Sequence, residues 1–502
     1  MSDRRATPTN TWANTVLVFL VLSVCYVYFF PRWADPNQNS RLDMVIAVVE
    51  DGTFQIDDYV ENTVDYAKVG EHYYSDKAPG AAFLSIPVYA VLKGFLDLPI
   101  MDSVMDKLAD NDALKATLRE EGTGLLEHKV RFAVAQVALT FVASTLPTAL
   151  MGALMYRLLA RFTARLWPRI GVVLGYSLLT PALAYAGAFY GHQLSAACLF
   201  GAFYLVFVGP NVRTKPLPTR SLLTVGLLLG YSVVTEYPST LIVGILFLHT
   251  FCRLSDRRRI SWVIFTGALI AAGWMTYNNA IFGSPFELGY SYSELWTKQH
   301  HTGFMSLTWP HWDAIWGITF SPFRGLFVLS PLLLLAVPGF ILWHRSGEHR
   351  PEFWVALTSV LVMFLFNSSS IMWWGGFAIG PRYLLPMLPF MALPIVFVFR
   401  EWKNRTWMRV LSILLFAWSL IATWGLTLAG QAFPHDTLRN PLVEYAWPNW
   451  QMGNVARNLG MFLHLPGILS LLPLLGGVMA LLASMGFLSR KGPALMTESR
   501  SV

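Results

Sequence analysis

Long apolar stretches without a single charged side chain dominate this sequence. Residues 11–30, 132–156, 325–343, 383–399 and 460–489 contain no Asp, Glu, Lys or Arg. A helix of about 20 apolar residues crosses the ~30 Å hydrocarbon core of a bilayer, and most of these stretches approach or exceed that length. The pattern therefore predicts an all-α polytopic membrane protein.

The hydropathy pattern predicts about twelve transmembrane helices. They are expected near residues 11–30, 130–156, 170–186, 190–210, 221–236, 237–252, 260–280, 324–343, 353–371, 383–399, 409–430 and 462–488. An even number of spans puts both ends of the chain, 1–10 and 489–502, on the same side of the membrane. The side expected for both is the cytoplasm. Residues 129–488 would then form the transmembrane bundle.

Composition and charge support this class and add an orientation. Only 13% of the residues are charged and the mean hydropathy is +0.46, whereas about a quarter of the residues of a soluble protein are charged. The net charge of +7 concentrates in short loops such as the one that holds Arg157, Arg161, Arg165 and Arg169. Loops of this kind lie in the cytoplasm according to the positive-inside rule. The basic balance therefore indicates topology in the plasma (inner) membrane, and it does not indicate nucleic-acid binding.

One long segment, residues 31–128, follows the first predicted span and would face the outside. Its apolar positions over 42–49 predict a short helix that ends at Gly52. The apolar stretch 81–98 is broken by Pro87, so it suits an interfacial helix better than a span. Two shorter outer loops are expected at 281–323 and 431–460, and the first carries tryptophans typical of membrane boundaries: Trp296, Trp309, Trp312 and Trp316.

Several ionisable residues stand where a bilayer core would exclude them. Glu236 separates two short apolar stretches, and His192 lies within an uncharged segment from 170 to 212. Ionisable groups at such depth usually face a polar cavity. The alternatives are a Glu236 that reaches water through local thinning of the bilayer and a His192 that only packs.

Arg324 and Arg382 each begin an apolar helix on the predicted outer side. A guanidinium offers a planar fork for phosphate oxygens, although both side chains could instead extend to lipid headgroups. The stretch HYYSDKAPG, residues 72–80, adds a lysine, Lys77, beside Asp76 at the edge of the membrane. Lys77 is expected to face a lipid phosphate, with Asp76 as its ion-pair partner.

Six segments, taken in order, resemble the C-type glycosyltransferases, the superfamily that includes protein O-mannosyltransferases and lipid A aminoarabinose transferases. They are NSRLDMVIAVVEDGTFQID (39–57), HYYSDKAPG (72–80), TEYP (235–238), YNNAIFGSPFELGY (277–290), FSPFRGLFVLSP (320–331) and WWGGFAIGPRYLLP (373–386). The resemblance implies a helical bundle with a large first outer loop that bears interfacial helices. It also implies an enzyme that transfers a sugar, usually with inversion, from polyprenyl phosphate to an acceptor glycan, lipid or protein on the outer face.

The resemblance also suggests roles for the polar residues. It implies no cofactor beyond the donor lipid, because side-chain cations can stabilise a phosphate leaving group and a metal need not be present. Lys77, Arg382 and Arg324 would hold the donor phosphate. The remaining substrate-binding candidates are Arg41, Tyr74, Asp76, His192, Glu236 and Tyr237.

The resemblance fails at the catalytic base. The acidic pair that the family carries before an arginine falls on Gln38 and Asn39 when the segments are matched at Arg41, and an amide cannot serve as a base. Carboxylates elsewhere in the loop are Asp35, Asp43, Asp57, Asp58, Asp65 and Asp76, of which Asp57 and Asp65 are preferred as catalytic residues. The same departure supports an alternative, a non-catalytic subunit on this scaffold that binds a lipid-linked glycan, flips it or assists assembly.

Overall fold

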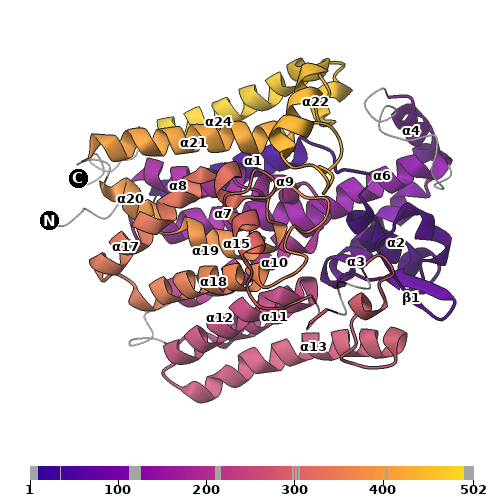
Figure 1. Ribbon diagram of the computed structural model, residues 1–502, viewed down its shortest axis with the longest axis horizontal. Coiled ribbons are helices and arrows are strands. Elements are labelled where there is room, and N and C mark those ends of the chain that lie inside the picture. Colours follow the sequence, from indigo (N-terminus) through magenta and orange to yellow (C-terminus); the bar gives the residue numbers. More distant parts are fainter. Residues whose placement is uncertain are drawn as a thin grey trace, which may run out of the picture.

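The computed structural model describes residues 9–33, 35–111, 126–209, 216–296, 299, 302–303, 306–401 and 405–490. The predicted cytoplasmic ends, 1–10 and 489–502, lie largely outside these residues. Figure 1 shows a bundle of helices with a smaller, mostly helical lobe at the end that lies far from the two termini.

Long apolar helices form the bundle. They are α1 (Thr9–Val27), α6 (Leu126–Thr140), α7 (Leu146–Leu159), α8 (Leu166–Leu178), α10 (Gly191–Val208), α11 (Thr219–Thr235), α12 (Thr240–Arg253), α13 (Ser261–Phe282), α18 (Arg350–Ser368), α21 (Thr406–Thr427) and α24 (Leu472–Arg490). Seven helices in the described part of the chain are long and apolar enough to cross a membrane, and three more are apolar but shorter. The protein is therefore a multi-pass membrane protein, and the number of twelve spans stays a prediction.

Two of the predicted spans are interrupted helices. Residues 324–343 contain α16 (Leu326–Leu329), η6 (Pro331–Leu335) and the start of α17 (Ala336–Ser346), and residues 383–399 contain η7 (Arg382–Met387), α19 (Leu388–Ala392) and most of α20 (Ile395–Glu401). Proline removes a backbone donor and clashes with the preceding turn, and Pro331, Pro386 and Pro394 stand at or near these breaks. Broken backbone is tolerated at membrane depth where protein surrounds it, and most of the second segment is buried inside the molecule.

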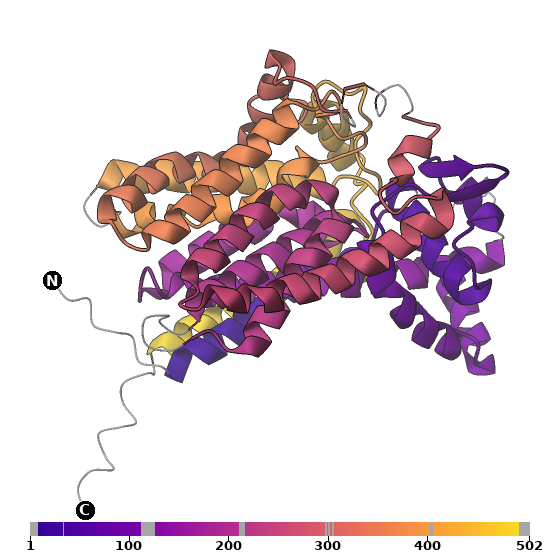
Figure 2. The same cartoon turned by 90° about the horizontal axis from the view of Figure 1, so that it is seen from below.

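The predicted outer segment forms the lobe at one end of the bundle (Figure 2). It contains α2 (Pro36–Glu50), η1 (Asp57–Asn62), β1 (Tyr66–Val69), β2 (His72–Ser75), α3 (Gly80–Leu96) and α4 (Pro99–Ala109). The helix predicted over 42–49 is α2, which begins six residues earlier and is followed by Gly52 at φ 70°. The apolar stretch 81–98 is α3, and α4 follows it after a bend of 97°.

A two-stranded hairpin in this lobe departs from the all-α prediction. Strands β1 and β2 are antiparallel, with Tyr66 opposite Ser75 and Val69 opposite His72. The turn between them contains Gly70 at φ 62°, a left-handed conformation that favours glycine. Each strand has only four residues, too few for the alternating pattern to stand out in the sequence.

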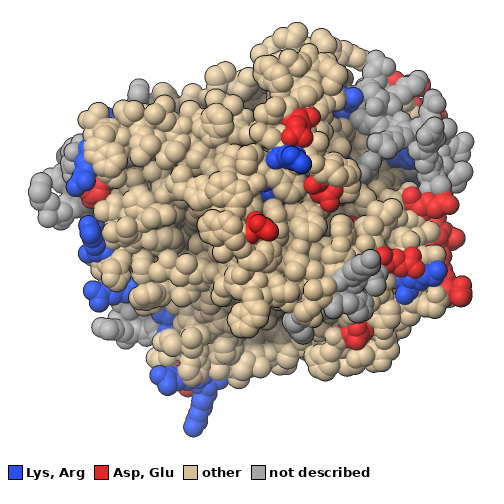
Figure 3. Space-filling view, viewed as in Figure 1, with Lys and Arg blue, Asp and Glu red and all other residues tan. Residues whose placement is uncertain are grey.

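Charge is separated along the bundle axis. Lys and Arg gather at the end that carries the termini and Asp and Glu mostly at the lobe (Figure 3). We name the first the basic end, defined by the arginines at the ends of α7, α12, α17 and α20: Arg157, Arg253, Arg345 and Arg400. Arg253 and Arg400 make ion pairs there with Glu352 and Glu348. Both termini of the described chain also lie at the basic end.

Small residues allow a close contact between the helices α11 and α13. A methyl group added to Gly226 of α11 would collide with the side chain of Thr266 and the backbone of Val263 on α13. The Thr266 hydroxyl donates to the carbonyl oxygen of Leu223 across the same contact, at 2.9 Å. Helices in a membrane are held by such close backbone approach, because lipid tails provide no hydrophobic force between them.

Replacing Gly226 by alanine is therefore expected to destabilise the bundle by about 1–3 kcal/mol, the usual cost of overpacking. Thermal unfolding of the purified protein in detergent measures the effect. Gly244→Ala on α12 is the matched control, because nothing lies within 4 Å of a methyl group added there. Equal stability of the two variants would show that the α11–α13 contact relaxes without cost.

Candidate active site

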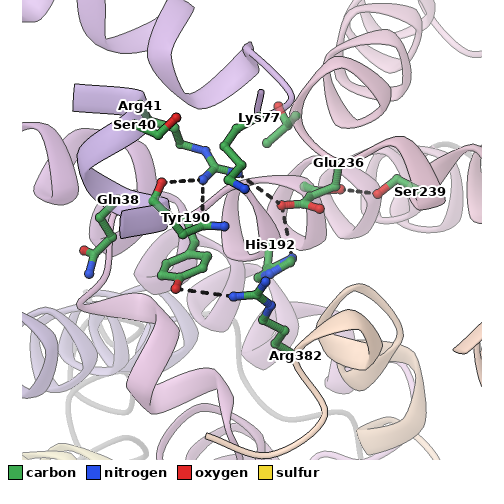
Figure 4. A network of polar contacts seen from close by, with 12 residues as sticks. Gln38, Ser40, Arg41, Lys77, Tyr190, His192, Glu236, Ser239 and Arg382 are labelled. Atoms are coloured by element: carbon green, nitrogen blue, oxygen red, sulfur yellow. Dashed lines mark hydrogen bonds and ion pairs between the residues drawn. The ribbon is translucent and has the colours of Figure 1, made fainter. Parts of the chain in front are cut away.

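A cavity of about 450 Å³ lies where the lobe meets the bundle. Its polar wall comes from segments far apart in the sequence. The residues that matter for its chemistry are Asp35, Arg41, Asp65, Lys77, Tyr190, His192, Glu236, Tyr237, Tyr290, Arg382 and Tyr383. Figure 4 shows several of these side chains pointing toward one another from the lobe and from the bundle.

Lys77 is a buried cation that the lobe contributes to the cavity. Its Nζ lies 3.0 Å from Asp65 Oδ2 and 3.0 Å from Asp76 Oδ1, and all three side chains are buried. The hairpin explains this arrangement, because Asp65 precedes β1 and Asp76 follows β2, so pairing of the strands brings the two carboxylates together. HYYSDKAPG therefore forms the second strand and the ion-pair cluster that follows it.

The charged groups of this cluster shift one another's pKa values. Burial raises the pKa of the Asp65 carboxyl, but Lys77, Arg382 and Arg41 more than offset this effect, and the net shift is downward. Burial likewise opposes the charge on Lys77, yet the two carboxylates raise its pKa. Asp65 and Lys77 are therefore held as ions.

Glycine allows this cluster to dock onto the bundle. The turn at Pro79 leads into α3 at Gly80, where an added methyl group would collide with Thr235 at the end of α11. The Tyr231 hydroxyl donates to the Gly80 carbonyl oxygen at 2.7 Å. This contact sets Lys77 next to the corner that carries Glu236.

Glu236 joins the bundle to the lobe, because its carboxylate lies close to one side chain from each of them. It stands between α11 and η3 (Tyr237–Ser239), and its Oε1 lies 3.1 Å from His192 Nδ1 and 4.0 Å from Arg41 Nη2. Gly191, directly before His192, has no room for a side chain, because a methyl group there would meet Thr235 and Glu236. The polar cavity predicted to surround Glu236 and His192 is therefore present.

Arg382 enters the cavity from the opposite wall. Its guanidinium lies over the rings of Tyr190 and Tyr383, 5.4 Å from each centroid, and Nη1 donates to the Tyr190 hydroxyl at 3.4 Å. Gly375, at φ 71°, lies directly against the Arg382 side chain, and an added methyl group would come within 3.0 Å of its Nε. The Trp-Trp-Gly-Gly segment thus leaves room for the arginine.

Asp35 places a carboxylate on the hydroxyl of the same tyrosine, Tyr190. The Tyr190 hydroxyl donates to Asp35, with oxygen separations of 3.0 and 3.1 Å, while Asp35 also accepts from the Gln38 amide at the start of α2. Burial raises the pKa of the Asp35 carboxyl, and hydrogen bonds and Arg382 offset only part of this effect. Among the described residues, Asp35 has no ion pair.

Gln38 and Asn39 point away from this chemistry. Gln38 accepts from the Phe189 amide at 2.7 Å and donates to the Arg32 carbonyl oxygen at 3.1 Å. Asn39 donates to the carbonyl oxygen of Asn62 at 2.9 Å. Both amides bind backbone, and neither lines the cavity.

Four of the predicted site residues do not line the cavity. Asp57 bonds to His72 Nδ1 and to the Tyr73 amide, each at 2.7 Å, on the exposed side of the hairpin. The Tyr74 hydroxyl accepts from Gln55 at 3.4 Å. Asp76 contacts Lys77 Nζ but does not itself line the cavity.

The fourth, Arg324, is buried within the bundle. It donates to the carbonyl oxygens of Gly376 at 2.9 Å and of Trp374 and Pro434 at 3.4 Å. It therefore holds the segment that precedes Arg382 in place.

The cavity also contains residues that the sequence does not predict for the site. Tyr190, Tyr290 and Tyr383 are absent from the predicted set, and Asp35 is one of the alternatives for the base. The position of Tyr383, directly after Arg382, could have indicated that it belongs to the site. Nothing in the sequence distinguishes Tyr190 and Tyr290 as site residues, because tyrosines are common at membrane boundaries.

Buried donors of two arginines are unused. Arg41 Nε and Arg382 Nε have no hydrogen-bond partner among the described residues, although both atoms are buried. Both arginines line the cavity, so the positive charge of their guanidinium groups would stabilise an anion bound there. No cluster of three His, Cys, Asp or Glu side chains suited to a metal occurs in the described part of the chain.

Comparison with known proteins gives weak structural likenesses. No family model and no curated protein matches the chain. Two of the similar solved structures are of ArnT from Cupriavidus metallidurans, in the apo state and bound to undecaprenyl phosphate. Each is 13% identical with a TM-score of 0.43, and each comparison covers 96% of this chain and 78% of that one. Likeness at this level carries no inference about the function of this protein.

Removing the cation from the buried cluster should change how stability depends on pH. In Lys77→Met, Asp65 and Asp76 lose their partner, so the fold should lose about 3–5 kcal/mol at pH 8. Their folded-state pKa values would then exceed the unfolded values, the folded state would bind more protons, and stability should rise as the pH falls toward 5.

Thermal unfolding at pH 8 and pH 5 tests this prediction. Lys93→Met is the control, because Lys93 makes an exposed pair with Asp97, and exposed pairs contribute little. A Lys77→Met variant as stable as the parent at both pH values would contradict the importance of the cluster.

Proposed function

We propose that this protein is an integral membrane glycosyltransferase that moves a sugar from a polyprenyl-phosphate carrier to an acceptor hydroxyl on the outer face of the plasma membrane. The observation that carries the proposal is the meeting of three cations and three carboxylates around one cavity. The cations are Arg41, Lys77 and Arg382, and the carboxylates are Asp35, Asp65 and Glu236. The motif resemblance noted in the sequence points to the same reaction.

The cations suit the phosphate of the donor. Arg41 and Arg382 both line the cavity, and an arginine can bind two phosphate oxygens at once. Lys77 adds a charge that its two carboxylates hold in position. In the reaction the bond between the sugar and phosphate breaks, and the negative charge that builds up on the phosphate oxygen is stabilised by these cations.

Asp35 is the carboxylate best suited to act as general base. Asp65 is ion-paired with Lys77 and its pKa is lowered, and Glu236 is paired with His192 and lies near Arg41. Asp35 accepts only from neutral donors, and burial raises its pKa. A base with a raised pKa binds the proton of an acceptor hydroxyl more strongly.

The chemical step is a single displacement. The acceptor oxygen attacks the anomeric carbon, its proton passes to Asp35, and the polyprenyl phosphate leaves from the opposite face of the sugar. One displacement inverts the anomeric configuration. In this scheme Glu236, His192 and Tyr237 orient the sugar, and Arg324 acts only by holding the Gly376 segment.

An apolar rim of the cavity supports a lipid-linked donor. Leu241 of α12 and Phe366 of α18 are apolar lining residues, and Leu241 is also exposed on the surface. A carrier bound here would keep its prenyl chain in the bilayer while its phosphate reached Arg382.

One observation favours a different function. The amides of Gln38 and Asn39 stand where the resembling family carries its acidic pair, and both are occupied with backbone contacts. A non-catalytic subunit that binds a lipid-linked glycan, flips it or assists assembly would need no base. In that case the purified protein would bind polyprenyl-phosphate sugars and transfer none of them.

Arg382→Gln should lower the rate of sugar transfer by about 10²–10³-fold, because it removes a cation at the departing phosphate. Purified protein with radiolabelled polyprenyl-phosphate sugars and a panel of acceptors measures the effect. Arg131→Gln is the matched control, since Arg131 pairs with Asp97 on the surface. If the Arg382→Gln variant turned over as fast as the parent, Arg382 would not be part of the active site.

Asp35→Asn should lower the maximal rate by about 10²–10⁴-fold with little change in donor binding, as expected for loss of a general base. Asp57→Asn should leave the rate close to that of the parent, because Asp57 lies outside the cavity. The same assay, with donor binding measured separately, distinguishes the two. Loss of transfer in Asp57→Asn together with full activity of Asp35→Asn would reverse the assignment.

A further inference from the structure

The outer loop that follows α21 holds the segment just ahead of Asp35. The side-chain amide of Gln431 in this loop donates to the Pro31 carbonyl oxygen at 2.8 Å, and the Phe30 amide donates to the Arg457 carbonyl oxygen at 2.9 Å. The first of these contacts joins residues 400 positions apart. The start of α2, where Asp35 is the N-cap residue, is therefore fixed to the C-terminal part of the chain.

Phe433 projects from the same loop into the protein interior. Its ring is buried, and the guanidinium carbon of Arg32 lies over it, 4.4 Å from the centroid. The Tyr185 ring stacks on it at 5.4 Å and 18°, and the Tyr190 ring meets it edge-on at 5.8 Å and 88°. A cation over an aromatic face and aromatic pairs of these geometries are both favourable. One ring thus contacts a buried cation and also the tyrosine that donates to Asp35.

Arg32 is a cation close to Asp35 in the sequence that is directed elsewhere. It stands three residues before Asp35 and is buried, and its Nη2 donates to the Thr427 carbonyl oxygen at 2.7 Å. Burial lowers the pKa of the Arg32 guanidinium, and the charge of Asp35 offsets part of this effect. An opposite charge in contact with a carboxyl lowers its pKa, so an Arg32 that turned toward Asp35 would make it a weaker base.

Other titratable groups also act on Asp35 from the elements packed around it. They include Tyr190 of α10, Arg382 of η7 and Asp65 ahead of β1. None of these three is changed in the variants described below. A change in the pKa of the Asp35 carboxyl in those variants would therefore report on the position of Arg32.

We propose that Phe433 is a positioning residue for the base of the candidate active site. Its ring holds the Arg32 guanidinium away from Asp35 and supports Tyr190, which donates to Asp35. The inference rests on the proposed function, in which Asp35 receives the proton of the acceptor hydroxyl. Phe433 acts only through its neighbours, because neither it nor Arg32 lines the cavity.

Phe433→Leu should change the pH dependence of sugar transfer. Loss of the ring frees Arg32 to pair with Asp35, and the pKa of the Asp35 carboxyl then falls. Since the base must be deprotonated, the acidic limb of the kcat/KM profile should move to lower pH, by about 1–3 pH units. A weaker base should also lower kcat by about 10-fold, with little change in KM for the donor.

Removing the charge of Arg32 should reverse this movement. In Phe433→Leu/Arg32→Gln the acidic limb should return to its position in the parent, because residue 32 no longer carries a charge that pairs with Asp35. Trp447→Leu is the control for loss of an aromatic side chain from the same loop, and it should leave the profile unchanged, since Trp447 is exposed. A limb that stays in place in Phe433→Leu, or that stays displaced in the double variant, would overturn the proposal.

Infrared titration of the Asp35 carboxyl distinguishes failure of this inference from failure of the proposed function. The band of protonated Asp35 is identified by its absence from Asp35→Asn, and it can be followed without sugar transfer. It should titrate at lower pH in Phe433→Leu than in the parent, and at the pH of the parent in the double variant. Titration at the same pH in Phe433→Leu and the parent would show that Phe433 does not keep Arg32 from Asp35.

The proposed function fails on a different result. A parent that transfers no sugar, or an Asp35→Asn variant that transfers it at the rate of the parent, would overturn the role of Asp35 as base, whatever the infrared titration gives. If Phe433→Leu does not fold, Phe433→Met replaces it in both measurements, because the flexible methionine side chain fills irregular space. Thermal unfolding in detergent checks that each variant is folded.

Discussion

The buried ion pairs of Lys77 with Asp65 and Asp76 are the interaction on which the candidate site depends. An isolated charge inside protein at a membrane boundary would be very costly, and only close partners of opposite sign make it tolerable. The short hairpin supplies both partners by bringing the two ends of its strands together. The lobe therefore presents a fixed cation toward the bundle, and the side chains of the bundle complete a cavity around it.

Backbone contacts at glycine hold the two halves of this cavity at the required distance. Gly80 lets the lobe touch the end of α11, Gly191 lets α10 approach Glu236, and Gly375 makes room for Arg382. A side chain at any of these positions would collide with a neighbour that carries or supports a charged group. Close approach of small residues, which stabilises helices in membranes, thus also positions the polar groups that the proposed chemistry requires.

The charged side chains lie at opposite ends of the bundle for an electrostatic reason. Such side chains are costly at the centre of a bilayer and much less costly at its boundaries. At the lobe, cations and carboxylates are mixed around the cavity, which suits group transfer between polar substrates. At the basic end, arginines predominate, and Arg253 and Arg400 pair with Glu352 and Glu348.

The sequence by itself determined the membrane class, the long apolar helices, the basic loops and the segment that forms the lobe. These features follow from hydropathy and periodicity, which act over 10–20 neighbouring residues. Only the tertiary structure decided which polar side chains meet. The sequence offers both Asp57 and Asp35 as bases in the loop, and it offers Arg324 as well as Arg382 as a phosphate-binding residue at the start of a helix. Which of them faces the cavity depends on packing between segments more than a hundred residues apart, such as the contact of Asp35 with Tyr190, and no local pattern encodes such a contact.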